Sequence, residues 1–439
     1  MKKRFTSLID LVKDSSWQTK LSFIFMGTGQ FLYGSRGKGI IFFAVELLAI
    51  YYFYIRGIND IKGFFTLGTK AMDPWTNTAG DNSVVMLLVG ILAFIVLIGF
   101  VLVYVMNVKD AYETQKKVER NKPLESLGKI VKKLFDQKFY VLALFLPVIG
   151  VCIFNILPII FMILISFTNY GGKIVPPALV DWVGVENFIK ITTLAEFAPT
   201  FIKILSWNML WAVCSTALNY FAGLGLALLL NKDCVKGKAI WRAFPILAYA
   251  IPGFITLLAF KFMFSYGGPI NELIRSAGGN AIGFLDIDAK WKARIIGLVV
   301  NCWVSVPSIM LLATGQLSNR DMSIYEAAKI DGATSFQQFK SLTLPYMIFT
   351  TTPVILSQFV GNFNNFGIFY FLRGGLYLDG YFLASDTDLL INWLYNLSID
   401  NNYYCIGAAI SLIIFIITSI ISLLVYINSA AYKEEDTFQ

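Results

Sequence analysis

Apolar residues fill long blocks of this chain, and polar residues gather in the segments between the blocks. Each block is close to the roughly 20 residues that a helix needs to cross the hydrocarbon core of a bilayer. The sequence lacks the short alternating segments of a transmembrane barrel. The pattern therefore predicts an all-α, polytopic membrane protein with about eight transmembrane helices. The predicted spans cover residues 39–56, 84–106, 139–167, 205–230, 243–264, 294–315, 346–371 and 403–428.

The segment before the first span contains two apolar stretches that are too short to cross a membrane. Phe5, Leu8, Ile9 and Val12 fall on one helical face, which predicts either a helix in the membrane interface or a cytoplasmic tail. Residues 21–33 are interrupted by glycine, so we expect this stretch to be re-entrant or to pack on the first span.

Composition agrees with a membrane protein and excludes several kinds of chemistry. Of the 439 residues, 56% are hydrophobic and 15% are charged, whereas a soluble domain carries roughly 25% charged residues. The chain has no histidine, which excludes histidine acid–base catalysis and histidine metal ligands. Its five cysteines are odd in number and lack metal-ligand spacing, so no disulfide framework is expected.

Lysine and arginine positions predict the orientation, because these residues are enriched in cytoplasmic loops. The loop 107–138 carries nine of them, so we expect it in the cytoplasm. The loop 372–402 has one arginine against four aspartates, so we expect it outside the cell. With eight spans, both termini and the tail 431–439 are then cytoplasmic.

The polar stretch YEAAKIDGATSFQQFKSLTLPY, residues 325–346, lies between two apolar blocks on the expected cytoplasmic side. Ser323 and Glu326 form an S-x-x-E pair, which predicts a capping box and a short helix. A second capping box is predicted from Ser335 and Gln338. Gly332, between the two helices, is expected to end the first one in a left-handed conformation.

This polar stretch is much longer than a connection between two spans requires. One interpretation is a docking element for a cytoplasmic partner, with Phe336 and Phe339 as apolar contacts. The other is an amphipathic loop that lies on the lipid surface. Pro345 falls near the start of the next span, where its missing N–H is harmless.

The same stretch resembles the EAA signature of ABC-importer permeases. Glu326-Ala327-Ala328 is followed at the family's spacing by Gly332 and by Leu344-Pro345, and Leu342 stands where isoleucine is usual. Segments such as FVGNFNNFGIF and YAIPGFIT are similar to the larger permease subunit of maltose/maltodextrin importers. The likeness covers roughly residues 140–430. This chain lacks the large extracytoplasmic domain of the Gram-negative permeases, as do the shorter permeases of Gram-positive bacteria.

The resemblance implies a type I ABC-importer permease core of six helices at residues 139–430. Residues 1–138 would then hold two accessory helices and a basic cytoplasmic loop, and residues 323–345 would form the coupling loop. The implied partners are a second permease, two ATPase subunits that bind ATP and Mg, and an extracellular solute-binding protein. The implied location is a bacterial plasma membrane. The implied ATPase-coupling residues are Glu326, Ala327, Ala328, Asp331, Gly332, Leu344 and Pro345, to which the docking interpretation adds Phe336 and Phe339.

The chain itself is not expected to be an enzyme. No segment fits the phosphate-binding pattern G-x-x-x-x-G-K-[ST], so the energy of ATP must come from a partner. An ion-coupled secondary transporter is the alternative, and it would bury carboxylates as relays. The spans are nearly free of such groups, with Glu46 the main exception, for which a helix-pairing or interface role is expected.

A sugar pathway requires hydroxyl-binding polar groups inside the membrane. Two sets share a predicted helix face: Asn301, Ser305 and Ser308, and separately Asn362 and Asn365. The alternative is that these groups join neighbouring helices. The resemblance implies sugar contact for Tyr249, Asn301, Asn362 and Asn365, in maltose or maltodextrin transport. The full candidate set is Tyr249, Asn301, Ser305, Ser308, Gln358, Asn362 and Asn365.

The sugar itself is not defined by these residues. Other oligosaccharides and glycerol phosphate stay open as substrates. A phosphate ester would call for arginine or lysine near the pathway, and the sequence offers no clear candidate.

Overall fold

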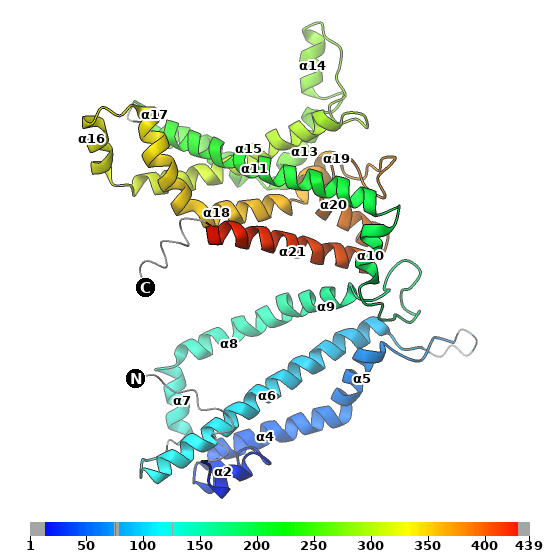
Figure 1. The fold of residues 1–439 in the computed structure, drawn as a ribbon, viewed down its shortest axis with the longest axis vertical. Coiled ribbons are helices and arrows are strands. Elements are labelled where there is room, and N and C mark those ends of the chain that lie inside the picture. The colour runs from blue at the N-terminus through cyan, green and yellow to red at the C-terminus, as the bar shows by residue number, and fades with distance from the viewer. Residues whose placement is uncertain (1–13, 74, 76–78, 125, 233, 429–439) are drawn as a thin grey trace. The chain divides into compact units, whose positions relative to one another are not determined.

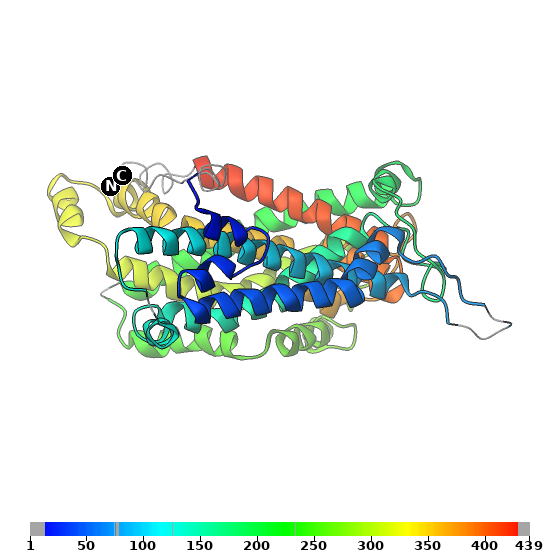
Figure 2. The same cartoon turned by 90° about the horizontal axis from the view of Figure 1, so that it is seen from below.

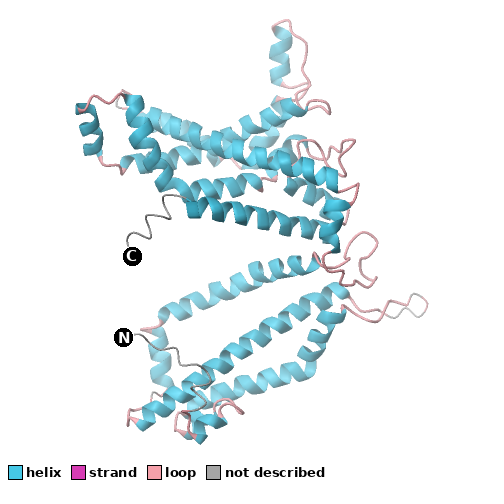
Figure 3. Cartoon of the chain, in the orientation of Figure 1, coloured by secondary structure: helices cyan, strands magenta, loops and turns pink. Residues whose placement is uncertain are grey.

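The structure is a computed structural model that describes residues 14–73, 75, 79–124, 126–232 and 234–428. Helices and loops account for these residues, apart from isolated bridges such as Thr168 with Trp182 (Figure 3). The all-α prediction is confirmed. The predicted helix at Phe5–Val12 and the tail 431–439 lie outside the described residues.

Six helices in the described part of the chain are long and apolar enough to cross a membrane. These helices cover Arg36–Thr66, Ser83–Glu119, Phe139–Ile165, Ala198–Asn231, Lys290–Ser318 and Tyr404–Asn428. A seventh span is possible if α12 (Lys238–Ala250) and α13 (Gly253–Met263), which are bent by 93°, form one crossing.

Two of the eight predicted blocks are interrupted in the structure. The block 243–264 is broken at Ile251, which is extended because Pro252 follows it. The block 346–371 is broken after Phe363, where α18 (Leu344–Phe363) ends before α19 (Gly367–Arg373) begins. Hydropathy alone did not reveal either break, since apolar residues continue across both.

Contacts divide the chain into two units, one up to Gly184 and one from Val185. The first unit contains α2 (Trp17–Leu21), α3 (Thr28–Leu32) and α7 (Leu127–Phe135). It also contains three longer helices (Figure 1). The first is α4 (Arg36–Tyr52), which continues through η1 (Phe53–Gly57) into α5 (Ile58–Thr66), and the second is α6 (Ser83–Glu119). The third is α8 (Phe139–Val151), which continues through η2 (Cys152–Ile156) into α9 (Leu157–Ile165).

Residues 21–33 pack on the first span, which was one of their two predicted placements. A Cβ atom at Gly27 would clash with the carbonyl oxygen of Gly39 on α4, so only glycine allows this approach. Glu46 on α4 accepts a hydrogen bond from the Met26 amide at 2.8 Å. The carboxylate thus joins α4 to the preceding segment, in agreement with its predicted helix-pairing role.

The second unit is built around two long helices, α11 (Ala198–Asn231) and α15 (Lys290–Ser318), that pack along each other (Figures 1 and 2). Gly223 permits the close approach, because a Cβ there would lie 2.6 Å from Cβ of Ile309. The other elements are α10 (Glu186–Thr193), α14 (Pro269–Ser276), α16 (Met322–Ile330), α17 (Ser335–Gln338), η3 (Phe339–Thr343), α20 (Leu390–Tyr395), η4 (Asn396–Asp400) and α21 (Tyr404–Asn428).

Candidate functional site

The polar stretch forms a helix, a glycine turn and a second helix, as predicted. The first helix, α16, begins after Asp321, whose carboxylate accepts a hydrogen bond from the Ser323 amide at 2.9 Å. The predicted capping box of Ser323 and Glu326 is therefore wrong, because Asp321 caps the helix two residues earlier. Hydrogen bonds from the side chain and amide of Ser323 lower the pKa of Asp321 below its usual value.

The turn at Gly332 has the geometry of a Schellman motif. Gly332 has φ +81°, a left-handed conformation that favours glycine. Its amide donates to the Lys329 carbonyl at 3.1 Å, and the Ala333 amide donates to the Ala328 carbonyl at 2.9 Å. The carbonyls at the end of α16 are satisfied in this way, and the chain reverses toward the second helix.

The second helix, α17, begins one residue earlier than predicted. Thr334 is its cap: the Gln337 amide donates to the Thr334 hydroxyl at 3.3 Å, and the Thr334 amide donates to the Gln337 side chain at 2.8 Å. The predicted box of Ser335 and Gln338 is therefore wrong. Helix α17 continues through the π-helical turn η3 into α18, so Pro345 lies in the first turn of α18 and not at the start of a separate helix.

The predicted coupling element, residues 322–345 and called the coupling element below, has one of the two predicted phenylalanines exposed. Phe336 is 71% exposed, whereas Phe339 packs against the core cluster that includes Met347. Ile330 is 87% exposed beside the turn and was not singled out from the sequence. Glu326, Ala327 and Asp331 are exposed, Ala328 and Leu344 are half-buried, and Pro345 is exposed.

Helix α16 has a single buried residue, Tyr325. Its hydroxyl lies 3.1 Å from the hydroxyl of Thr343 in η3, and the guanidinium of Arg320 lies 4.5 Å from its ring centroid. Tyr325 thus ties the exposed helix to the root of α18. The sequence signal was an aromatic residue next to the EAA triplet, inside an otherwise polar stretch.

Three of the predicted sugar-site residues come together at the far end of α18. The Asn301 amide donates to Asn362 at 3.2 Å, and the Asn365 amide donates to Asn301 at 3.2 Å. The Asn362 amide donates to the hydroxyl of Thr216 on α11 at 3.0 Å. Asn301 and Asn362 are 2% and 4% exposed. The asparagine cluster therefore joins three helical segments in this conformation.

The predicted shared helix face of Asn362 and Asn365 is wrong, because α18 ends at Phe363 between them. Two residues of α11 stabilise this helix end. The Trp211 indole donates to the Asn362 carbonyl at 3.0 Å, and the Asn208 amide donates to the Phe363 carbonyl at 3.1 Å. Neither residue, nor Thr216, was predicted, since their contacts are distant in sequence.

The remaining candidates lie outside the asparagine cluster. Tyr249 is 58% exposed on α12, just before the break at Ile251. The Ser308 hydroxyl donates to the Ser305 carbonyl at 2.8 Å, so this pair is bonded within its own helix. Gln358 is half-buried on α18.

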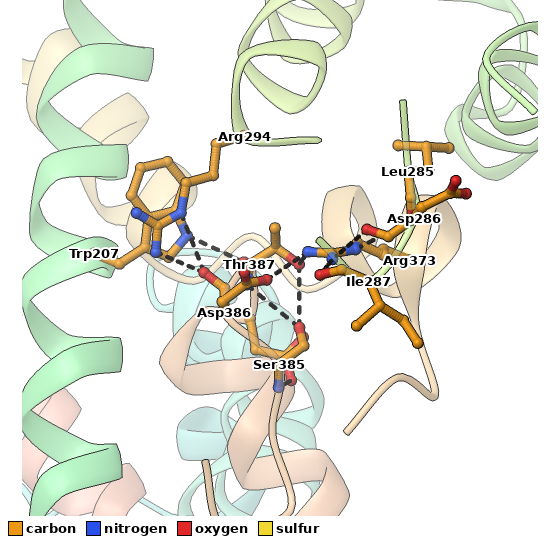
Figure 4. Close-up of polar contacts among 10 residues, drawn as sticks. Trp207, Leu285, Asp286, Ile287, Arg294, Arg373, Ser385, Asp386 and Thr387 are labelled. Atoms are coloured by element: carbon orange, nitrogen blue, oxygen red, sulfur yellow. Dashed lines mark hydrogen bonds and ion pairs between the residues drawn. The ribbon is translucent and has the colours of Figure 1, made fainter. Parts of the chain in front are cut away.

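A second buried polar cluster links the loops beside α15 and α19 (Figure 4). Arg373 pairs with Asp386 at 2.5 Å and donates to the carbonyls of Asp286 and Ile287 at 2.6 and 2.8 Å. Arg294 donates to the Asp386 carbonyl at 2.6 Å. Arg294, Arg373 and Asp386 are all buried, although the sequence showed Arg373 and Asp386 only as loop charges.

Two side chains extend this arginine cluster. The guanidinium of Arg294 stacks 3.8 Å from the ring centroid of Trp207, whose indole donates to the Thr387 carbonyl at 3.1 Å. Asp388 accepts from the amide and hydroxyl of Ser385 at 2.9 and 2.8 Å. Burial raises the pKa of Asp388 to about 6 despite these hydrogen bonds. The described residues contain no group of acidic or cysteine side chains that fits a metal ion.

Comparisons with known proteins agree with this architecture. Residues 220–433 match the family model described as "Binding-protein-dependent transport system inner membrane component". The chain is 32% identical to the maltodextrin transport system permease protein MalC of Streptococcus pneumoniae, over 98% of this chain and 99% of MalC. It is 33% identical to the galactooligosaccharides transport system permease protein GanP of Bacillus subtilis, over 94% of this chain and 97% of GanP.

A solved structure shares the fold. It is the crystal structure of a bacterial ABC transporter involved in the import of the acidic polysaccharide alginate, with a TM-score of 0.55 and 20% identity over 68% of this chain and 96% of that chain. The likeness to this structure concerns the fold, and the nearly full-length match to MalC shows the family. The chain belongs to the inner membrane components of binding-protein-dependent ABC transport systems: it is a multi-pass permease subunit and not an enzyme.

Proposed function

We propose that this permease imports an oligosaccharide, with maltose or maltodextrin as the favoured substrate. The observation that carries the importer part of this proposal is the coupling element, in which the Schellman turn at Gly332 joins two helices and Phe336 is exposed. The relatives MalC and GanP are named for the transport of maltodextrin and galactooligosaccharides, so an oligosaccharide is the class that they share. The cell membrane of a bacterium, with both termini in the cytoplasm, is the proposed location.

The proposed partners are a second permease, two ATPase subunits and an extracellular solute-binding protein. The ATPase subunits bind ATP and Mg and contact the exposed face of the coupling element. Glu326, Ala327, Asp331 and Phe336 are the exposed groups available for this contact, and Gly332 sets their direction. Phe339 and Leu344 pack at the root of the element instead, and Pro345 lies exposed in the first turn of α18.

Helix α18 supports a mechanical link between the ATPase contact and the sugar site. Its 20 residues run from the coupling element to Asn362, a length of about 30 Å. Tyr325 and Thr343 connect α16 to the start of this path. Closure of the ATPase subunits then displaces α18 and opens the asparagine cluster on alternate sides of the membrane.

The sugar pathway is proposed to include Asn301, Asn362, Asn365 and Tyr249, with Ser305, Ser308 and Gln358 beside them. In the described conformation, Asn301 and Asn362 bond to each other. Sugar hydroxyls replace these bonds when the helices separate. An amide that always has a partner avoids the cost of an unsatisfied polar group in the membrane.

The test is ATP hydrolysis by the reconstituted complex, measured with the binding protein and a series of sugars. Maltodextrins are expected to stimulate hydrolysis, whereas monosaccharides and glycerol phosphate are not. If only a different oligosaccharide stimulates hydrolysis, maltose and maltodextrin are not the substrates. If no sugar changes the rate of hydrolysis and an ion gradient drives sugar uptake, the proposal of an ATP-driven importer is wrong.

A further inference from the structure

Helix α7 is amphipathic, with apolar residues on one face and lysines on the other. Apolar residues occupy positions 127, 130, 131, 134 and 135, the spacing of one helical stripe. Lys129, Lys132 and Lys133 occupy the remaining arc of the helix, together with Gly128. Such a helix, short and basic on its polar side, is the type that lies in a membrane interface.

The position of α7 in the chain also places it at a membrane surface. Helix α7 ends at Phe135, and the span formed by α8, η2 and α9 begins at Phe139. Figure 1 shows that α7 turns away from the direction of α8. Val131 and Phe135 are 49% and 63% exposed in the described unit, so its packing leaves these apolar side chains open.

The polar side of α7 offers positive charge to a ligand. Residues 126–138 contain four lysines against one aspartate. A hollow beside the helix is lined by Lys129, Lys132, Lys133, Asp136 and Gln137. Lys129 and Lys132 are exposed there. Asp136 is the one carboxylate in the hollow, so the lining stays net positive.

We propose that α7 is a membrane-surface helix whose lysine face binds the headgroup phosphates of anionic phospholipids in the cytoplasmic leaflet. Val131 and Phe135 enter the acyl-chain boundary, and Lys129 and Lys132 reach the phosphates above it. The positive-inside rule predicts the lysine-rich loop 107–138 on the cytoplasmic side, where anionic lipids attract basic segments. The proposal concerns lipid binding and does not depend on the transported substrate.

The matched control comes from the same loop. Helix α6 has 37 residues, a length of about 55 Å, whereas the hydrocarbon core is about 30 Å thick. Its last turns therefore extend beyond the bilayer. Lys116 and Lys117 lie in those turns, and their replacement removes the same charge from the same loop at a distance from the lipid.

The experiment compares the full chain with Lys129→Gln/Lys132→Gln and Lys116→Gln/Lys117→Gln variants in detergent. Native mass spectrometry measures bound phosphatidylglycerol and phosphatidylcholine, and thermal unfolding checks that each variant is folded. The native chain is expected to prefer phosphatidylglycerol. The Lys129/Lys132 variant is expected to bind it about tenfold more weakly, and the Lys116/Lys117 variant is expected to match the native chain.

A second measurement tests the location directly. In phosphatidylcholine nanodiscs that contain phosphatidylglycerol, Lys129 and Lys132 are expected to react several-fold more slowly with an amine-reactive reagent than in phosphatidylcholine alone. Equal lipid binding by the two variants would overturn the proposal, as would reactivity that is independent of lipid charge. Loss of an ATPase subunit from the Lys129/Lys132 variant, with lipid binding unchanged, would instead make α7 a protein contact.

Discussion

At the scale of single residues, Gly332 decides the direction of the coupling element. A Cβ at Gly332 would meet nothing within 4 Å, so the cost of a side chain there lies in the backbone conformation. A left-handed conformation costs about 1–2 kcal/mol for an ordinary residue, and asparagine tolerates it better. The turn was readable from the sequence, because a glycine followed a helical polar segment at the right distance.

Because asparagine tolerates the left-handed conformation better than valine, two substitutions at Gly332 are expected to have different effects. Gly332→Val is expected to lower sugar uptake more than about tenfold while the complex still hydrolyses ATP, because α16 no longer presents its exposed face correctly. Gly332→Asn is expected to keep most of the uptake. Uptake and hydrolysis are measured in the same vesicles. Native uptake by Gly332→Val would show that the turn does not matter for coupling.

Tyr325 offers a test of the link between α16 and α18. Tyr325→Phe removes one hydrogen bond, worth about 1 kcal/mol, and keeps the buried ring. We expect a few-fold loss of sugar-stimulated hydrolysis and little change in unfolding temperature. Thr343→Val is expected to have the same effect, and the double variant is expected to be no worse than either single variant. Additive losses would mean that the two hydroxyls act separately.

Asp388 predicts a pH dependence that is easy to detect in a chain without histidine. Its pKa is about 6 in the folded chain against an ordinary 3.8, so the folded state holds an extra proton between these values. The free energy of unfolding therefore falls, by on the order of 2 kcal/mol, as pH rises from about 4 to 6. Thermal unfolding of the detergent-solubilised chain between pH 4.5 and 7 measures this loss.

The control for this titration is Asp388→Asn, which keeps an oxygen to accept from Ser385 but cannot ionise. Its unfolding temperature is expected to vary much less over the same pH range. An equal slope in the variant and the native chain would assign the effect to another group.

At the scale of elements, the arginine cluster holds the ends of α15 and α19 against neighbouring loops. Removal of one partner from a buried ion pair costs about 3–5 kcal/mol, because the other charge stays buried. Arg373→Ala is therefore expected to destabilise the chain by this amount. Arg373→Ala/Asp386→Ala is expected to be more stable than Arg373→Ala alone. Chemical or thermal unfolding of the two variants makes the comparison, and a double variant that is less stable would contradict the pairing.

Element boundaries show where local reasoning succeeds and where it fails. The two helices of the coupling element were predicted, but Asp321 and Thr334 cap them in place of the serines. Several residues near each start were suitable caps, and only the backbone conformation selects one. The break at Ile251 had a local signal in the following proline, whereas the end of α18 at Phe363 depends on contacts with Asn208 and Trp211.

At the scale of the whole molecule, composition and hydrophobic pattern were sufficient to predict a helical membrane protein. The asparagine cluster was only partly predictable, because Thr216, Asn301 and Asn362 are brought together by tertiary packing. Likewise, the burial of Arg294 and Arg373 reflects loops that meet across long sequence distances. Local spacing carries no information about such contacts.

This permease is proposed to work with a second permease and with ATPase subunits, which it contacts through residues 322–345. The most direct test is to purify the tagged chain from its native membrane in mild detergent and to identify the accompanying proteins by mass spectrometry. A second permease with its own EAA element and an ATPase subunit are expected to purify with the chain. A chain that purifies alone, under conditions that keep known importer complexes intact, would contradict it.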